Sequence, residues 1–157
     1  MGGYYYERFF DVYGCAAIKD EVVKYVATKR MGTPVLNKKG EPTGEVIPVE
    51  WELKAVDSET DELLRKECTK KVPIQGKRGQ YTQEVDTDKY TGRLCVASTV
   101  YPDLNNAELQ DSYGVKSGDA LLKKMLKPGE YLDYKTKVME VNGYDLSMED
   151  LVDEAKN

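Results

Sequence analysis

The stretch AELQDSYGVKSGDALLKKMLKPGEY, residues 107–131, decides how the second half of the chain folds. It contains two short amphipathic segments joined by a turn that bears Gly114, and Ser117 stands where it would cap the second segment. Three interpretations fit this pattern: a DNA-reading helix-turn-helix, a phosphate-holding loop at a helix start, and a connector between packed helices. The surrounding sequence decides among them.

The charge distribution argues against nucleic acid and anionic membranes as partners. Residues 1–99 carry 16 acidic and 16 basic side chains, whereas residues 100–157 carry 12 acidic and 7 basic, so the net charge of −5 lies in the last third. Such a region repels phosphates. A recognition helix would also begin with base-reading Arg, Asn or Gln, but the chain has Ser117, Gly118 and Asp119 there.

The phosphate-loop interpretation is also weak, because the glycine pattern GxxxxGK[ST] is missing. Capping by Ser117 accounts for the Ser-Gly pair. The connector interpretation is therefore favoured. It predicts helices over about 106–113, 118–126 and 128–142, with Gly143 just past the last one.

Further cap signals predict helices on either side of these three. Ser58 starts a helix that reaches about residue 69, Asp88 caps one that stops before Pro102, and Ser147 opens a final helix through Ala155. A core stripe is predicted at helical spacing along 128–142; its members are Tyr131, Tyr134, Val138 and Val141.

Strand character is confined to residues 21–56. Residues 22–30 are β-branched and aromatic, and Ile47, Val49, Trp51, Leu53 and Ala55 alternate with polar residues and Pro48. Between them, residues 31–45 read as a long hairpin excursion or a mobile loop, and residues 73–82 as an exposed basic connector. The predicted fold class is α+β, with an N-terminal antiparallel β-hairpin or small sheet (21–56) packed against a mainly α-helical region (57–157) of about five short helices.

The kinds of residue in the chain argue against several common classes of enzyme and metal site. The chain has no histidine, and its three cysteines, Cys15, Cys68 and Cys95, lack CxxC spacing and suit a reducing compartment. The acidic residues are scattered, with no pair to nominate for acid/base catalysis. We therefore expect no catalytic, metal-binding or cofactor-binding residues, and no membrane span, because no run of about 18 apolar residues exists.

Six segments, in order, carry a resemblance to a known family. They are IPVEWELKAV (47–56), LLRKECTKK (63–71), GKRGQYTQEVDTDKYTGRL (76–94), NAELQDSYGV (106–115), ALLKKMLKPGEY (120–131) and VMEVNGYDLSMEDLVDEAKN (138–157). As a set they resemble the XkdN-like tail assembly chaperones of contractile-tailed phages and defective prophages. The resemblance covers about residues 20–157. It implies a single domain over 21–157, preceded by an aromatic-rich N-terminal extension over 1–20.

The resemblance implies a non-catalytic assembly factor. Such a chaperone binds the tape measure protein and keeps it soluble while tail tube subunits polymerise around it, in the cytoplasm of the bacterial host, and is absent from the mature particle. Tail tube subunits and further copies of the chain are additional partners to consider. Two alternatives stay open: a structural subunit of the tail or baseplate, and a helix-turn-helix regulator.

A partner-binding groove is the remaining expectation from the sequence. Aliphatic and Met side chains, which adapt to irregular partners, cluster in the C-terminal helices. The candidate residues are Leu109, Tyr113, Leu122, Met125 and Leu126. Burial in the protein's own core explains the same five residues and is the favoured alternative.

Overall fold

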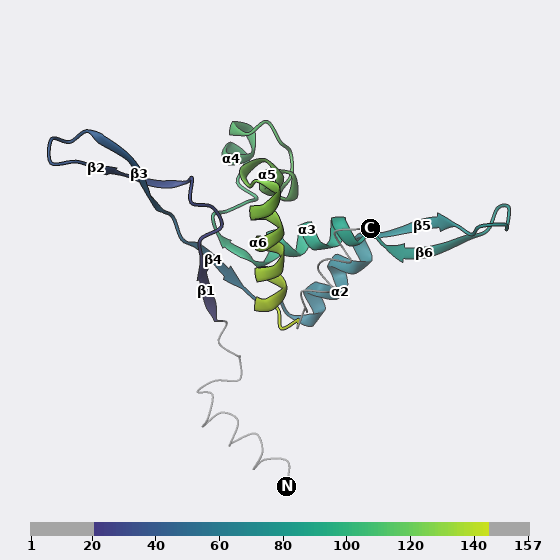
Figure 1. The fold of residues 1–157 in the computed structure, drawn as a ribbon. Helices are drawn as coiled ribbons and strands as arrows, with labels where there is room; N and C mark the ends of the chain where they lie inside the picture. The colour runs from purple at the N-terminus through teal and green to yellow at the C-terminus, as the bar shows by residue number, and fades with distance from the viewer. Residues whose placement is uncertain (1–20, 145–157) are drawn as a thin grey trace, which may run out of the picture.

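The computed structural model describes residues 21–144, which form small antiparallel sheets and five helices (Figure 1). The strands are β1 (Val22–Tyr25), β2 (Gly32–Leu36), β3 (Pro42–Pro48), β4 (Trp51–Lys54), β5 (Thr69–Pro73), β6 (Tyr81–Val85) and β7 (Thr99–Tyr101). The helices are α2 (Ser58–Glu67), α3 (Thr87–Ser98), α4 (Ala107–Ser112), α5 (Gly118–Met125) and α6 (Pro128–Val141). The class is α+β, as predicted.

A three-stranded antiparallel sheet in the order β1-β4-β7 underlies the helices. Its central strand β4 turns Trp51 and Leu53 inward, where they are 1% and 0% exposed, so the predicted alternation is confirmed at these residues. The alternating stretch is nevertheless not one strand. It breaks at Val49 and Glu50, and the preceding residues pair with β2 in a separate hairpin.

The core lies between this sheet and helices α3, α5 and α6. The Tyr134 ring of α6 packs edge-on against Trp51, with centroids 5.3 Å apart, and also contacts Tyr25. Tyr134 and Val138 are fully buried, and Tyr131 and Val141 are half-buried. This confirms the predicted core stripe, in which each fully buried large apolar side chain contributes about 1.5–3 kcal/mol.

Helix boundaries follow the predicted caps closely. Ser117 caps α5, Pro128 is the first residue of α6, and Gly143 adopts φ 85° just past its end, a conformation that favours glycine. Two predicted caps are wrong by one or two residues. Asp57 caps α2 instead of Ser58, and Asp86 caps α3 instead of Asp88, because each of these carboxylates accepts a backbone N–H in the first turn, at 2.7 and 3.2 Å.

The prediction that strands are confined to the N-terminal part is wrong. Strands β5, β6 and β7 lie within residues 57–157, interleaved with the helices. Strands β5 and β6 form a hairpin that is exposed along most of its length, so it has no buried face to produce an alternating apolar pattern. The predicted final helix from Ser147 and the extension 1–20 lie outside the described residues.

Two hairpins project from opposite sides of the body in Figure 1. We call the β2–β3 hairpin, residues 31–48, the first arm, and the β5–β6 hairpin, residues 69–85, the second arm. Each is a separate two-stranded sheet. The predicted long hairpin excursion is thus confirmed for residues 31–45, and the predicted basic connector 73–82 contains the turn of the second arm.

Candidate partner-binding surfaces

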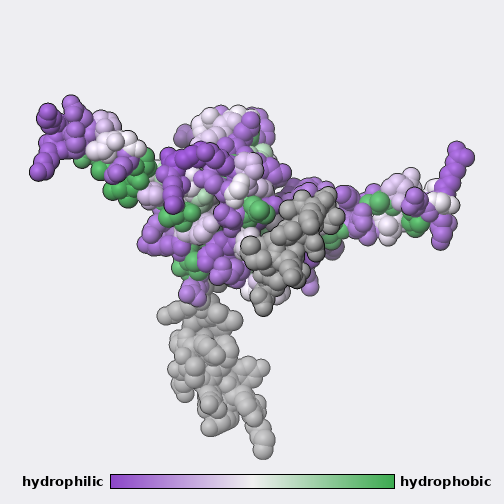
Figure 2. All heavy atoms as spheres, in the orientation of Figure 1, coloured by the Kyte–Doolittle hydropathy of each residue, from purple (hydrophilic) through white to green (hydrophobic). Residues whose placement is uncertain are grey.

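The first arm presents apolar side chains to solvent on a charge-balanced ribbon. Leu36 is 56% exposed and Ile47 61% exposed. The arm's charged residues are Lys38, Lys39, Glu41 and Glu45, two of each sign. Figure 2 shows hydrophobic side chains along this arm and a hydrophilic tip. Exposed apolar groups on a two-stranded ribbon with open edges are typical of surfaces that contact other chains.

Local hydrogen bonds fix the turn of the first arm. The Asn37 side-chain oxygen accepts from the backbone N–H groups of Lys39 and Glu41, at 2.8 and 3.0 Å, and the Asn37 backbone N–H donates to the Glu41 carbonyl at 2.8 Å. An Asn that bonds the backbone two residues on is a common turn former. The arm therefore has a defined turn although its strands contact little of the body.

The base of the first arm is anchored to the corner between α5 and α6. The Arg30 guanidinium donates to the Met125 carbonyl at 3.0 Å and to the Glu130 carboxylate at 2.6 Å. The hydrogen bond from Arg30 to Glu130, together with ones from Thr28 and the Lys127 backbone, lowers the pKa of Glu130 to about 2. The arm's direction is thus coupled to the start of α6 by a charge-assisted hydrogen bond.

The second arm is basic and also carries exposed apolar groups. Tyr81 is 62% and Val85 38% exposed. Its charged residues are Lys70, Lys71, Lys77, Arg78 and Glu84, which give four positive charges and one negative charge. In Figure 2 hydrophobic residues again lie along the arm and hydrophilic ones at its tip. The two arms therefore share a shape and differ in charge.

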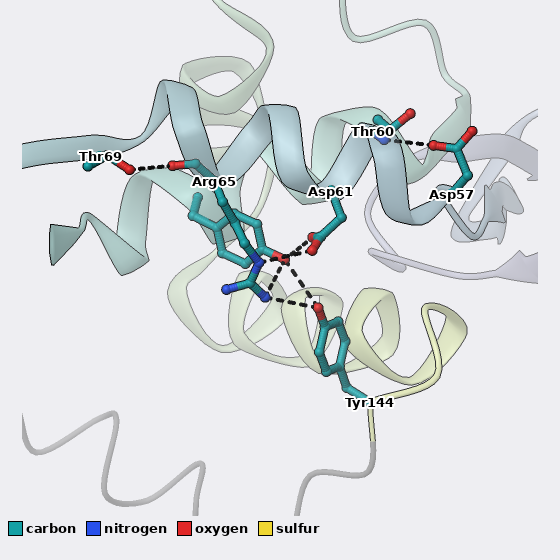
Figure 3. A network of polar contacts seen from close by, with 7 residues as sticks. Asp57, Thr60, Asp61, Arg65, Thr69 and Tyr144 are labelled. Atoms are coloured by element: carbon teal, nitrogen blue, oxygen red, sulfur yellow. Dashed lines mark hydrogen bonds and ion pairs between the residues drawn. The ribbon is translucent and has the colours of Figure 1, made fainter.

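A hydrogen-bonded cluster holds α2, from which the second arm extends, against α3 and the end of α6 (Figure 3). The Arg65 guanidinium donates to Asp61 at 2.9 Å and to the Tyr144 hydroxyl at 3.0 Å, and lies over the Tyr90 ring at 4.5 Å. The Tyr90 hydroxyl donates to Asp61. Each of these polar groups has a partner, so the cluster serves the packing of these elements.

An open cleft of about 410 Å³ lies between α2, α3 and the α4–α5 region. Val96 and Arg93 of α3 line it together with Leu64 of α2, Gln110 of α4 and Asp119 of α5. The lining mixes apolar and charged groups. Such an open, mixed surface suits contact with the side chains of another protein.

The structure separates the five residues predicted to form a groove. Leu122, Met125 and Leu126 are 0%, 5% and 5% exposed and belong to the core. Leu109 is half-buried against that core, and Tyr113 is 37% exposed at the end of α4. The core alternative thus describes the first three in this conformation, while Tyr113 and part of Leu109 face solvent. The exposed residues of the arms were not among the candidates. Leu36 and Tyr81 lie in segments predicted as loops, and Ile47 was predicted to share a strand face with the buried Trp51 and Leu53, which is wrong because it belongs to the first arm.

Within residues 21–144, no group of three or more Cys, Asp or Glu side chains is arranged to hold a metal ion. Both cysteines of this part are buried and free, and burial raises the pKa of the Cys95 thiol to about 12. Such a thiol is a poor nucleophile at neutral pH. No helix in the same part of the chain is long and apolar enough to cross a membrane.

The fold and its surfaces define a class: a small α+β protein with two projecting hairpins that each carry exposed apolar side chains, as in protein-interaction modules. The family model described as phage XkdN-like tail assembly chaperone protein matches residues 14–156. The chain therefore belongs to the family of XkdN-like phage tail assembly chaperones.

Individual relatives agree with this assignment. The phage-like element PBSX protein XkdN of Bacillus subtilis (strain 168) is 30% identical over 135 residues, covering 85% of this chain and 88% of that protein. The uncharacterized protein YqbN of the same organism is 31% identical over 133 residues, covering 84% and 87%. The crystal structure of YqbN superposes with a TM-score of 0.60 at 27% identity, covering 87% of this chain and 95% of that one.

Proposed function

We propose that this protein is a non-catalytic chaperone that binds the tape measure protein and keeps it soluble during tail tube assembly. The observation that carries the proposal is the pair of arms, which present Leu36, Ile47, Tyr81 and Val85 to solvent in a member of a tail assembly chaperone family. The site of action is the host cytoplasm, and the chaperone leaves before the particle is complete. Residues 21–157 act as one domain.

The physical basis is complementarity to an aggregation-prone chain. A long partner that exposes apolar stripes needs a holder with matching apolar groups and no deep, permanent pocket. The arms offer apolar side chains together with open strand edges, to which an extended partner segment can add. Because the two arms are separate, contacts that are individually weak combine through effective concentration.

Only some of the residues predicted to form a groove contact the partner in this proposal. Tyr113 and the accessible part of Leu109 extend the partner surface beside the cleft between α2, α3 and the α4–α5 region. Leu122, Met125 and Leu126 support α5 from inside, since their side chains are buried. A partner would contact these three only if α5 moved.

Co-expression tests the proposal. A tape measure fragment is produced with the wild-type chain, with a first-arm variant (Leu36→Ser, Ile47→Thr), or with a second-arm variant (Tyr81→Ser, Val85→Thr). We expect soluble yield and co-elution of the fragment to be high with wild type and reduced with both arm variants. The control is Leu132→Gln on α6, which removes an exposed apolar side chain, 41% accessible, away from the arms.

Two results would contradict the proposed chaperone function. One is a tape measure fragment whose solubility is the same with and without the chaperone. The other is mass spectrometry that finds the chain retained in purified particles in stoichiometric amount, which is the behaviour of a structural subunit.

A further inference from the structure

The second arm carries positive charge that the described part of the molecule leaves uncompensated. Its net charge is +3, from four basic residues and Glu84. Lys70 forms an ion pair with Asp86 at 3.6 Å. Among residues 21–144, Lys71, Lys77 and Arg78 have no ion-pair partner. The first arm, by contrast, has equal numbers of Lys and Glu and attracts neither sign of charge.

The last described residue contacts α2, the helix that leads into this arm. The Tyr144 hydroxyl accepts from the Arg65 guanidinium at 3.0 Å, and the Arg65 carbonyl accepts from the hydroxyl of Thr69, the first residue of β5, at 2.8 Å (Figure 3). Tyr144, to which residues 145–157 are joined, therefore lies against the helix from which the second arm extends.

The composition of that following chain complements the arm. Residues 145–157 carry five acidic side chains and one lysine, a net charge of −4, and also contain Leu146, Met148, Leu151 and Val152. Acidic groups match Lys71, Lys77 and Arg78, and the apolar residues match the exposed Tyr81 and Val85.

The length also suffices. An extended chain spans at most about 3.3–3.6 Å per residue, so 13 residues reach roughly 43–47 Å. A five-residue strand such as β5 is about 17 Å long. Even if the segment must first pass the full length of α2, ten residues or about 15 Å, an extended chain still reaches along this strand.

From these observations we propose that residues 145–157 dock on the second arm of the same chain, covering its cations and its exposed apolar side chains. Tethering at Tyr144 gives the segment a high effective concentration at the arm, so weak, salt-screened contacts are enough to keep it there. The consequence for activity rests on the proposed function: the segment occupies the arm until a partner displaces it.

Cross-linking of the full chain tests the docking directly. A zero-length carbodiimide reagent joins lysines to nearby carboxylates, and a mixture of ¹⁴N- and ¹⁵N-labelled protein distinguishes links within one chain from links between chains. We expect links from Lys70, Lys71 or Lys77 to acidic residues of 145–157 within single chains, decreasing several-fold when salt is raised from about 0.05 M to about 1 M. Links only between differently labelled chains, links to lysines outside the arm, or no links from this segment would overturn the proposal.

Trypsin provides a second readout, because it cleaves after Lys71, Lys77 and Arg78. The test variant neutralises the segment (Asp150→Asn, Asp153→Asn, Glu154→Gln), and a matched control neutralises three exposed carboxylates elsewhere (Glu59→Gln, Glu62→Gln, Glu108→Gln). We expect cleavage in the arm to become about threefold to tenfold faster in the test variant and to stay unchanged in the control. Equal rates in all three proteins would count against docking.

The docking of residues 145–157 and the proposed chaperone function are tested by independent experiments. Loss of tape measure solubilisation leaves the cross-links within one chain untouched, since they form without any partner. Absent cross-links, in turn, leave the co-expression result unchanged.

Discussion

At the scale of single residues, Gly118 shows how the stretch 107–131 is constrained by packing. It begins α5, and a Cβ placed on it would lie 2.8 Å from Val96 Cγ1 and 3.2 Å from the Leu104 carbonyl oxygen. Distances this short require the neighbours to move. The Ser-Gly pair that resembled an anion-binding element is therefore explained by a close approach of α5 to α3.

We expect Gly118→Ala to destabilise the protein by about 1–3 kcal/mol, even though Ala has the higher helix propensity. Gly129 in the first turn of α6 is the matched control, because a Cβ there meets nothing within 4 Å. Gly129→Ala should be neutral or stabilise by up to about 1 kcal/mol. Urea unfolding measures both, and equal effects of the two substitutions would contradict the steric explanation.

Glu130 provides a pH-dependent contribution at the base of the first arm. Its folded-state pKa, about 2, lies below the usual value of 4.5, chiefly because of its hydrogen bond with Arg30. A lowered carboxyl pKa stabilises the fold above the unfolded-state pKa, and that stability is lost as pH falls from about 4.5 to about 2. Because the pair is partly exposed, screening limits the contribution to about 1 kcal/mol.

Glu130→Gln should therefore lower the free energy of unfolding by about 1 kcal/mol at pH 7 and by progressively less as pH falls below 4.5. Chemical denaturation of wild type and variant at a series of pH values measures the difference. Glu62→Gln, at an exposed position on α2, is the control and should change the free energy of unfolding at pH 7 by less than about 0.5 kcal/mol. A difference that is constant from pH 7 to pH 2 would contradict the assigned pKa.

At the scale of elements, Asn142 joins three parts of the fold beyond the end of α6. Its side-chain oxygen accepts from the Val56 N–H at 2.9 Å, and its amide nitrogen donates to Ser98 Oγ at 2.9 Å and to the Val138 carbonyl at 2.8 Å. Ser98 is fully buried. One side chain therefore ties the chain after β4 and the end of α3 to α6.

Asn142→Ala should cost about 2–3 kcal/mol, because it leaves a buried hydroxyl and a backbone N–H with fewer partners. Asn105→Ala, at an exposed residue, should change stability by less than about 0.5 kcal/mol. Thermal or urea unfolding compares them. If both substitutions had equally small effects, the side chain of Asn142 would not be holding these elements together.

The elements also show which parts of the fold the sequence predicts and why. Caps are local, so Ser117, Pro128 and Gly143 mark helix ends correctly without knowledge of the rest of the chain. Apolar and polar residues alternate along a strand only where one face of the sheet is buried and the other is exposed. This alternation therefore identified Trp51 and Leu53 in β4 and failed for the second arm, which is exposed along most of its length.

The candidate site was harder to predict for a related reason. A helical apolar stripe has the same pattern whether it is covered by the protein's own core or by a partner. Leu122 and Met125 are covered by the core, and the sequence alone does not reveal this. The exposed Leu36 stands in a segment rich in Gly, Pro and Lys, and Ile47 continues the alternation of Trp51 and Leu53 although it pairs with β2. Both pairings depend on a hairpin register that composition does not specify.

At the scale of the whole molecule, the two arms project from opposite sides of the body (Figure 1), so under the proposed function a long partner has two separate surfaces to contact. Apart from Met31 at the base of the first arm, the arms do not pack against the main core, so removing their exposed side chains should leave global stability within about 0.5 kcal/mol of wild type. The effects of arm substitutions on partner binding can therefore be measured without a large change in stability. Comparing the two arm variants with their combination then shows whether both arms contact the same partner.

If one partner chain contacts both arms, each arm alone holds it weakly, and together they benefit from effective concentration. We then expect either arm variant, Leu36→Ser/Ile47→Thr or Tyr81→Ser/Val85→Thr, to weaken binding of a tape measure fragment by about 10–100-fold. Combining them should abolish detectable binding, because the second substitution removes the contact that still holds the partner. Titration by fluorescence anisotropy measures the dissociation constants. Losses of about twofold or less for each single variant would show that the arms bind the fragment as alternatives, and a loss confined to one arm would assign the contact to that arm alone.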